Sequence, residues 1–396
     1  MIKFADRVAR VKGSVTLEMT AVALQLRNEG KDVLNLSAGE PDFDTPRHIV
    51  EAGKKAMDDG FTRYTPAAGL PQTREAVTAK LKRDNNIDVT PAQVIVSNGA
   101  KHALFNACMA LFQEGDEVII FAPYWVSFPE FVHLAHATPV ILGSDPESNF
   151  EPHFDELAAA ITPRTRGIII NSPSNPTGGV WSREAIEQTI ALARESDLWI
   201  FSDECYERLT YDAPFESTAS IDPAYEKILT FQSCSKTYAM TGWRMGYMAG
   251  PVEVVNAMAK IQGQSTSSPN AIAQIAAIAA LTGDQGPAEE MKAAFKRRRE
   301  LMVDRLSAIP GISCGNPGGA FYVFLNVEEL FGKQAQGVQI SSPRDVSAYL
   351  LKKYYVVTVS GEGFGDDKHI RLSYALADED IIKATGRIAA AVSELE

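Results

Sequence analysis

The sequence predicts an α/β fold in which a mostly parallel sheet is covered by helices, followed by a smaller second domain. From roughly residue 50 to 285, short apolar runs typical of buried strands alternate with stretches typical of helices. Several of these runs end in polar residues, as strands do where the carboxyl edge of an open sheet binds a ligand. A long charged helix and a further apolar run at residues 320–325 then indicate a separate sheet.

The individual elements follow in a regular order along the chain. Buried strands are expected at residues 94–96, 118–121, 168–170, 199–201 and 228–231. Helices are expected at residues 101–112, from Ser182 onward, and from residue 288 to 305. The hydroxyl of Ser182 is a suitable N-cap for the second of these helices. Alternation of this kind is the pattern of parallel strands joined by crossover helices.

Length and composition are those of a globular protein with two domains. The 396 residues can bury a large core, and 45% are apolar and 22% charged, without a repeated or biased segment. The net charge of -12 disfavours a nucleic-acid surface, so an anionic ligand needs a local cluster of positive charge. Residues 1–6 lack a signal pattern, and no apolar run approaches the roughly 20 residues of a membrane span. We therefore expect a cytoplasmic protein with no membrane partner.

Cysteine and histidine spacing does not indicate a metal centre. His133 and His136 are three positions apart, a spacing at which two metal ligands could share a helix face, but no second pair of ligands stands nearby. The cysteines have neither metal-ligand spacing nor the density of a disulfide framework, and we expect free thiols at Cys108, Cys205, Cys234 and Cys314. No metal site is predicted.

The first candidate site is the polar segment Ser233-Cys234-Ser235-Lys236, which follows a predicted strand. Arg244 stands eight positions after the lysine. The hydroxyls of Ser233 and Ser235 and the guanidinium of Arg244 can hold a phosphate, and the amine of Lys236 can form a Schiff base with a carbonyl. A phosphate and an aldehyde together describe pyridoxal 5'-phosphate. The alternative, a solvated surface lysine, fits poorly with a place directly after a buried strand.

Two upstream segments carry the other groups that this cofactor needs. Asp203 and Tyr206 follow one predicted strand, and Asn175 lies in a proline- and glycine-rich turn after another. A carboxylate at the pyridine nitrogen keeps the ring protonated and lets it act as an electron sink, which is the role predicted for Asp203. Tyr206 and Asn175 are predicted to donate hydrogen bonds to the phenolate oxygen of the cofactor.

These motifs resemble those of the class I and II aminotransferases, which are pyridoxal-phosphate enzymes of fold type I. Further matching segments occur in the same order at residues 38–43, 64–69, 123–125 and 371–375. In order and spacing the chain is similar to bacterial subgroup I beta, which includes aspartate and prephenate aminotransferases. The resemblance implies a large cofactor-binding domain at residues 48–287 and a discontinuous, smaller α+β domain made of residues 1–47 and 288–396.

The resemblance also gives roles to single residues around the cofactor. Lys236 resembles the Schiff-base lysine, whose freed amine moves a proton, and it forms the predicted catalytic set with Asp203 and Tyr206. Trp125 resembles the aromatic residue that stacks on the pyridine ring, with ordinary core packing as the alternative. The amides of the turn at Gly99, Ala100 and Lys101 are expected at the phosphate, at a helix N-terminus.

A partner subunit is also implied. Tyr64 resembles a tyrosine that reaches the phosphate bound by the neighbouring subunit. A homodimer with shared active sites follows from that role.

For the substrate, Arg371 resembles the arginine that grips the α-carboxylate in a bidentate pair. The backbone at Gly39, together with Trp125 and Asn175, completes the predicted substrate-binding set. The alternative for Arg371 is a strand-end salt bridge.

The distal carboxylate of a dicarboxylic substrate needs a second cation. The animal-type aspartate enzymes use an arginine of the other subunit, in a segment that here spans residues 261–270 and contains no arginine. In subgroup I beta the N-terminal segment supplies a lysine, so Lys12 is the predicted partner. Glu18 stands where a small apolar residue is expected, which changes the local charge.

The predicted function is a ping-pong aminotransferase. It would move an amino group between aspartate or glutamate and the 2-oxo acids oxaloacetate and 2-oxoglutarate, with prephenate as a further acceptor. Two alternatives stay open, an aminotransferase for aromatic or other amino acids and a β-lyase that uses the same cofactor. A cofactor-sensing DNA-binding protein would carry a basic helix-turn-helix extension, which this acidic sequence does not favour.

Overall fold

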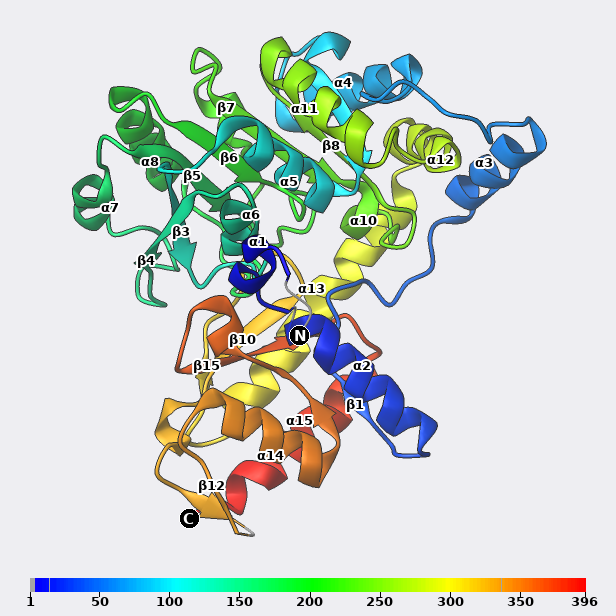
Figure 1. The fold of residues 1–396 in the computed structure, drawn as a ribbon. Helices are drawn as coiled ribbons and strands as arrows, with labels where there is room; N and C mark the ends of the chain where they lie inside the picture. Colours follow the sequence, from blue (N-terminus) through cyan, green and yellow to red (C-terminus); the bar gives the residue numbers. More distant parts are fainter. Residues whose placement is uncertain (1–3, 14, 336) are drawn as a thin grey trace.

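A seven-stranded mixed sheet forms the centre of the larger part of the molecule (Figure 1). In the computed structural model, which describes residues 4–13, 15–335 and 337–396, its strand order is β2-β8-β7-β6-β5-β3-β4. The strands are β2 (Val94–Asn98), β3 (Glu117–Ala122), β4 (Thr138–Gly143), β5 (Thr165–Asn171), β6 (Trp199–Asp203), β7 (Ile228–Ser233) and β8 (Met245–Ala249). Only β8 runs antiparallel to its neighbours β2 and β7. The predicted strands are confirmed, and so is a mostly parallel sheet.

Both faces of this sheet are covered because its strands are apolar on both sides. Ile169 of β5 packs with α5 (Ala100–Leu111), α6 (Phe128–Leu134) and α11 (Val252–Ser265). Its neighbours Ile168 and Ile170 pack on the opposite face with α8 (Arg183–Glu195) and α7 (Phe154–Ala160). This alternation is the period of two expected of a strand buried on both faces.

The predicted helices begin and end close to their expected positions. Ser182 caps α8, since its Oγ accepts a hydrogen bond from the backbone nitrogen of Ala185 at 3.1 Å. Helix α6 ends at Leu134, and His136 lies beyond it with a φ of 63°, so His133 and His136 do not share a helix face.

A smaller antiparallel sheet lies beside the C-terminal helices (Figure 1). Its order is β14-β15-β10-β9, with β9 (Ser313–Cys314), β10 (Tyr322–Asn326), β14 (Val359–Ser360) and β15 (His369–Ser373). Helix α13 (Gly286–Ser307) runs from the large sheet toward this sheet, and α14 (Pro343–Tyr354) and α15 (Asp378–Ser393) follow. The separate sheet predicted around residues 320–325 is therefore present.

Residues 15–35, near the N-terminus, lie against this smaller part. Strand β1 (Leu34–Asn35) pairs in parallel with β13 (Val356–Val357). Helix α2 (Val15–Asn28) precedes it, and α3 (Arg47–Asp58) leads to the larger part (Figure 1). The domain boundaries at residues 47/48 and 287/288 stay a prediction.

The remaining elements complete the two parts. They are α1 (Asp6–Arg10), α4 (Pro71–Asn85), α9 (Thr218–Ile221), α10 (Cys234–Thr237), α12 (Ala271–Thr282), β11 (Gln334–Ala335), β12 (Val338–Gln339), η1 (Pro91–Gln93), η2 (Glu328–Leu330) and η3 (Gly361–Phe364). Within the part of the chain that the structure describes, no helix is long and apolar enough to cross a membrane.

Candidate active site

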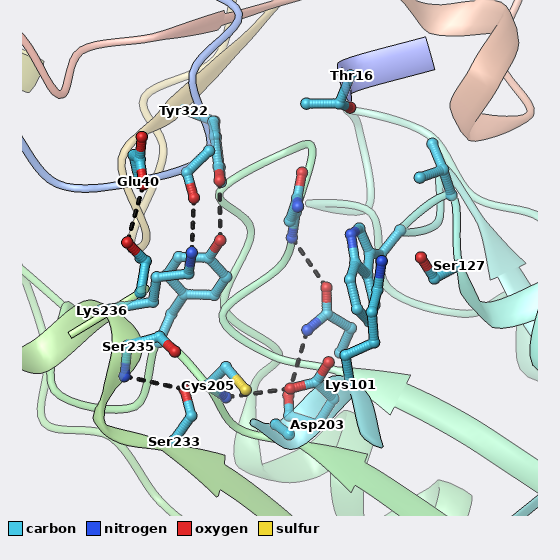
Figure 2. Close-up of a pocket in the computed structure, with 18 of the residues that line it drawn as sticks. Thr16, Glu40, Lys101, Ser127, Asp203, Cys205, Ser233, Ser235, Lys236 and Tyr322 are labelled. Carbon is cyan, nitrogen blue, oxygen red and sulfur yellow. Dashed lines mark hydrogen bonds between the residues drawn. The ribbon is translucent and has the colours of Figure 1, made fainter. Parts of the chain in front are cut away.

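A cavity of about 390 Å³ opens at the carboxyl ends of β5, β6 and β7, where the large and small sheets face each other. The strand register aligns these ends, because Asn171 of β5 pairs with Asp203 of β6 and Asp203 with Phe231 of β7. The predicted site residues that line the cavity are Gly39, Ala100, Lys101, Trp125, Asn175, Asp203, Tyr206, Ser233, Ser235, Lys236, Arg244 and Arg371. Figure 2 shows Ser233 and Asp203 at the sheet edge and Thr16 of α2 on the far side of the cavity.

Lys236 lies on the one-turn helix α10, directly after β7, and its amine points into the cavity (Figure 2). Its Nζ donates a hydrogen bond to the carbonyl oxygen of Gly39 at 2.6 Å. Burial lowers the pKa of this amine to about 8, and the positive charges of Arg244 and Arg371 act in the same direction. A substantial fraction of the amine is therefore neutral near pH 8, as a nucleophile requires.

Asp203 ends β6 and is almost fully buried. Its Oδ1 accepts a hydrogen bond from the backbone nitrogen of Cys205 at 3.1 Å. Burial raises the pKa of this carboxyl to about 6, against the opposing effects of the Cys205 hydrogen bond and the positive charge of Lys236. A buried carboxylate of this kind is suited to share a proton with a basic ring nitrogen.

Tyr206 joins the two parts of the molecule. Its hydroxyl lies 2.8 Å from the hydroxyl of Tyr322, which β10 of the small sheet supplies. Burial raises the pKa of Tyr206 well above its ordinary value, so the phenol stays protonated and can donate a hydrogen bond.

Arg371 on β15 is only 1% exposed, yet its guanidinium is not fully paired. Its Nη1 donates to Oδ1 of Asn175 at 2.8 Å, and its Nη2 donates to the carbonyl oxygen of Ser37 at 2.7 Å. The carbon Cζ lies 4.5 Å from the ring centre of Tyr322. The buried Nε has no hydrogen-bond partner among the described residues, although buried donors are nearly always paired. Arg371 lines the cavity, and the salt-bridge alternative for this residue finds no carboxylate among its described partners.

The residues that are expected to bind a phosphate lie near the turn between β2 and α5. The guanidinium of Arg244 donates to the carbonyl oxygens of Thr241 and Asn98, at 2.9 and 3.3 Å. Gly99 has a φ of +84°, and a Cβ there would lie 2.4 Å from Nη2 of Arg244. Only glycine lets the arginine cross this turn, so Gly99 makes room for Arg244 and does not itself line the cavity. Ser233 and Ser235 are linked by a hydrogen bond from the Ser235 nitrogen to the Ser233 Oγ at 3.3 Å.

Trp125 forms one wall of the cavity with Lys101. The Nζ of Lys101 lies 5.1 Å from the centre of the Trp125 ring, which is within cation–π range. Burial, and then the charge of Arg244, lowers the pKa of Lys101. The other side of the Trp125 ring packs edge-on against Phe128 and Phe131, so the indole has a fixed orientation.

Comparison with known proteins agrees with this geometry. The family model for aminotransferase class I and II matches residues 31–388. The chain belongs to this family. It is 46% identical over 394 residues to the aspartate/prephenate aminotransferase of Cereibacter sphaeroides, with 98% of each chain covered. It is 44% identical over 389 residues to the aspartate aminotransferase of Geobacillus stearothermophilus, again with 98% of each covered.

Solved structures give the same result for the fold. The aspartate aminotransferase of Rhizobium meliloti superposes with a TM-score of 0.96 at 40% identity, covering 100% of both chains. The enzyme of Thermus thermophilus, determined with maleate, has a TM-score of 0.93 at 41% identity and covers 99% of this chain and 100% of that one. The resemblance, the fold class and the assignment as an aminotransferase are thus confirmed.

Besides Gly99, two predicted residues of this aminotransferase lie outside the cavity. Tyr64 is 89% exposed and does not line the cavity of its own chain. Lys12 is exposed, and its backbone nitrogen donates to Oε2 of Glu130 at 3.1 Å. From the same N-terminal segment, Thr16 and Thr20 do reach the cavity wall, whereas Ser14 lies outside the described residues.

Several cavity residues of this aminotransferase were not predicted. Glu40, which accepts a hydrogen bond from the Thr241 hydroxyl at 2.8 Å, and Asn171 belong to motifs that the sequence does show. Tyr322 carries no local signal, because only the packing of the small sheet brings it to Tyr206. No cluster of three or more potential metal ligands occurs among residues 4–13, 15–335 and 337–396.

Proposed function

We propose that this aminotransferase uses pyridoxal 5'-phosphate and moves an amino group between aspartate or glutamate and 2-oxo acids, with prephenate as a further acceptor. The observation that carries the proposal is one cavity that holds an amine of lowered pKa, Lys236, together with a buried arginine, Arg371, whose Nε is unpaired. An amine and a carboxylate-binding fork are the two groups that an amino-acid substrate and an aldehyde cofactor need. The names of the relatives support the choice of aspartate and prephenate.

The residues that line the cavity are of the kinds that the cofactor needs. Ser233, Ser235 and Arg244 would hold its phosphate, and the N-terminus of α5 at Ala100 faces the same region. Asp203 would meet the ring nitrogen, and Trp125 would cover one ring face. When bound, pyridoxal phosphate supplies an aldehyde and an electron-withdrawing ring.

The protein groups then have separable tasks. Arg371 binds the α-carboxylate of the substrate and so fixes which bond at the α-carbon faces Lys236. The Nζ of Lys236 takes the α-proton as a neutral amine and returns it as an ammonium. Asp203 holds a proton at the ring nitrogen, and the hydroxyl of Tyr206 with the amide of Asn175 donates to the phenolate oxygen.

The distal carboxylate has two candidate cations. Lys12 is the residue that the resemblance implies, and in this structure its side chain is exposed. Lys101 is a cation that lines the cavity, beside Trp125, and to which neither the phosphate nor the α-carboxylate is assigned through its side chain. A flexible lysine accommodates both a short dicarboxylate and the bulkier prephenate more readily than a fixed arginine fork would. The variants Lys12→Ala and Lys101→Ala distinguish the two candidates when KM is measured for aspartate and for a neutral amino acid. Replacement of the lysine that binds the distal carboxylate should raise KM only for aspartate.

A homodimer, a cytoplasmic location and the two-domain division belong to the same proposal. The exposure of Tyr64 supports a shared site, since a residue that serves its neighbour must project from its own chain.

A half-reaction tests the function. Single amino acids, namely aspartate, glutamate, arogenate and phenylalanine, are added to purified holoenzyme, and the loss of the visible absorbance of the bound cofactor is followed. We expect fast conversion with aspartate, glutamate and arogenate. Reaction with phenylalanine or small neutral donors alone would contradict the dicarboxylate assignment. Release of pyruvate from a β-substituted amino acid without an oxo acid, as the main activity, would indicate the β-lyase alternative.

A further inference from the structure

A buried ammonium lies outside the cavity, next to the strand ends that carry the site. Lys80 of α4 is 2% exposed. Its Nζ donates to Oδ1 of Asn85 at 2.7 Å, to Oε1 of Glu207 at 2.7 Å and to Oε1 of Gln232 at 2.6 Å. An ammonium has three N–H groups and here finds three acceptors, so the charged form is fully satisfied. Burial of such a charge is costly unless it is paired in this way.

Gln232 links this ammonium to a second buried carboxylate. Its Nε2 donates to Oε2 of Glu204 at 3.0 Å, while its Oε1 accepts from Lys80 and from the hydroxyl of Tyr247. Glu204 is fully buried. Its carboxylate also accepts hydrogen bonds from Ser202 Oγ, Ser217 Oγ and Thr218 N. Lys80, Asn85, Glu207, Gln232 and Glu204 thus form one connected set, named here the Lys80 network.

Each of three members of the Lys80 network is a sequence neighbour of a site residue. Glu204 follows Asp203, Glu207 follows Tyr206, and Gln232 precedes Ser233. Gln232 and Ser233 are consecutive in β7, and Glu204 continues the ladder after β6 by donating its backbone N–H to the Phe231 carbonyl at 2.8 Å. Consecutive residues of a strand point to opposite faces of the sheet. The network side chains therefore hold these strand ends on the side away from the cavity, while the site residues face the cavity.

We propose that the Lys80 network is a positioning device for the proposed cofactor site, in which one buried ammonium and two buried carboxylates hold Asp203, Tyr206 and Ser233 in place and set the electrostatic field that the cofactor meets. This inference rests on the proposed function. None of the network side chains lines the cavity, so none of them is a catalytic residue. They act through the residues next to them in the chain, as outer groups act on metal ligands.

Other charged and titratable groups also contribute to this field. Lys236 and Cys205 lie beside Asp203, whereas Asp84, Arg208, Tyr238 and Cys234 surround Lys80 and Glu207. Burial raises the pKa of Glu204 to about 7, so its charge is present above that pH. Removing one charge of the Lys80 network leaves these other charges in place. The direction in which the pKa of the bound cofactor then shifts should match the sign of the charge that was removed.

The test is a pH titration of the visible absorbance of bound pyridoxal phosphate in purified holoenzymes. Glu204→Gln and Glu207→Gln each remove a negative charge with little change of shape, so the cofactor should lose its proton more easily and the midpoint should fall. Lys80→Met removes a positive charge, and its midpoint should rise. Shifts of the midpoint by roughly half to one pH unit are expected when a single charge is removed from a protein interior near the cofactor.

Opposite signs separate this inference from a purely structural effect, because loosened packing has no reason to follow the sign of the charge. Thr189→Val is the matched control, since Thr189 is fully buried on α8 and its Oγ1 bonds to the Ala185 carbonyl and to no other group among the described residues. Its midpoint should not move. If Lys80→Met does not fold, the two Glu→Gln variants decide, and an unchanged midpoint in either overturns the proposal. Shifts of equal sign in all three variants overturn it as well.

Measurements on the wild-type protein distinguish a failure of the network inference from a failure of the proposed function. A wild type that gains no visible absorbance with pyridoxal phosphate would overturn both. A wild type that binds the cofactor and transaminates, with variants that titrate as it does, would overturn the network inference alone.

Discussion

At the scale of single residues, the chemistry depends on how burial changes an amine and a carboxyl. Lys236 and Asp203 lie at the ends of adjacent strands, and burial moves both pKa values toward neutrality, to about 8 and about 6. The residue roles could be predicted from sequence because each motif is local and directly follows an apolar run. The shifts could not, because burial is a property of the assembled cavity.

Replacement of the lysine gives the first prediction. Lys236→Ala should reduce turnover to below about a thousandth of wild type, because the amine is the group proposed to move the α-proton. The cofactor should still bind through the contacts of its phosphate with Ser233, Ser235 and Arg244, although dialysis should remove it. Steady-state rates and the visible spectrum after dialysis check both points. Near-normal turnover in this variant would exclude Lys236 from proton transfer.

The lowered pKa of the same amine predicts a pH dependence. Because only the neutral amine attacks an aldehyde, capture of pyridoxal phosphate by the apoprotein should become faster as pH rises through about 8. The rate should increase about fivefold between pH 7 and 8 and level off above pH 9. Stopped-flow absorbance measures it. A rate that keeps climbing beyond pH 10 would mean that the amine has the ordinary pKa of a lysine.

The planar fork of Arg371 leads to a third prediction. Arg371→Lys keeps the charge but loses the geometry that reaches Asn175, Ser37 and a substrate carboxylate together. We expect kcat/KM for amino-acid substrates to fall about a hundredfold, whereas the affinity for the cofactor changes little. Arg297→Lys, at an exposed ion pair with Asp378, is the control and should behave as wild type.

At the scale of elements, the β2–α5 turn shows how a backbone conformation serves a distant side chain. Gly99→Ala faces both a positive φ and a contact of 2.4 Å with Arg244. The arginine must move, so we expect weaker binding of pyridoxal phosphate, by about tenfold or more, together with a modest loss of thermal stability. Fluorescence titration of the apoprotein measures the first effect. Gly115→Ala, also at positive φ but with no neighbour within 4 Å, controls for backbone strain alone.

Elements also set the limit of what the sequence could predict. The strands of the large sheet were predicted because apolar runs with β-branched residues are distinctive, and their polar ends placed Asp203 and Ser233 correctly at one edge. Tyr322 was missed because it reaches Tyr206 only when the small sheet packs against the large one. The carbonyl of Ser37 was missed as a partner of Arg371 because the two residues are far apart in the sequence. Lys80 was missed because a lysine on a polar helix looks exposed, and only tertiary packing supplies its three acceptors.

At the scale of the whole molecule, the cavity lies between the large sheet, whose strands come from residues 94–249, and the small sheet, whose strands come from residues 313–373. Gly39 and Arg371 come from segments near the two ends of the chain, whereas Asp203 and Lys236 come from its middle. The contact between Tyr206 and Tyr322, and the hydrogen bond from Lys236 to Gly39, join the two parts across the cavity. A substrate that binds Arg371 of the small sheet and reacts beside Lys236 of the large sheet contacts both parts. Its binding is therefore coupled to the relative position of the two parts.

The last prediction concerns a second copy of the chain. Tyr64 is 89% exposed, and we propose that it completes the site of the partner. Tyr64→Ala should weaken cofactor binding about tenfold, and Lys236→Ala should be inactive. When the two variants are mixed under conditions of subunit exchange, a mixed dimer contains one site with the lysine of one chain and the tyrosine of the other. Cofactor affinity at this site should return to the wild-type value, which titration of activity against pyridoxal phosphate would show. If Tyr64 instead served its own chain, every active lysine in the mixture would still lack it, and no recovery could occur.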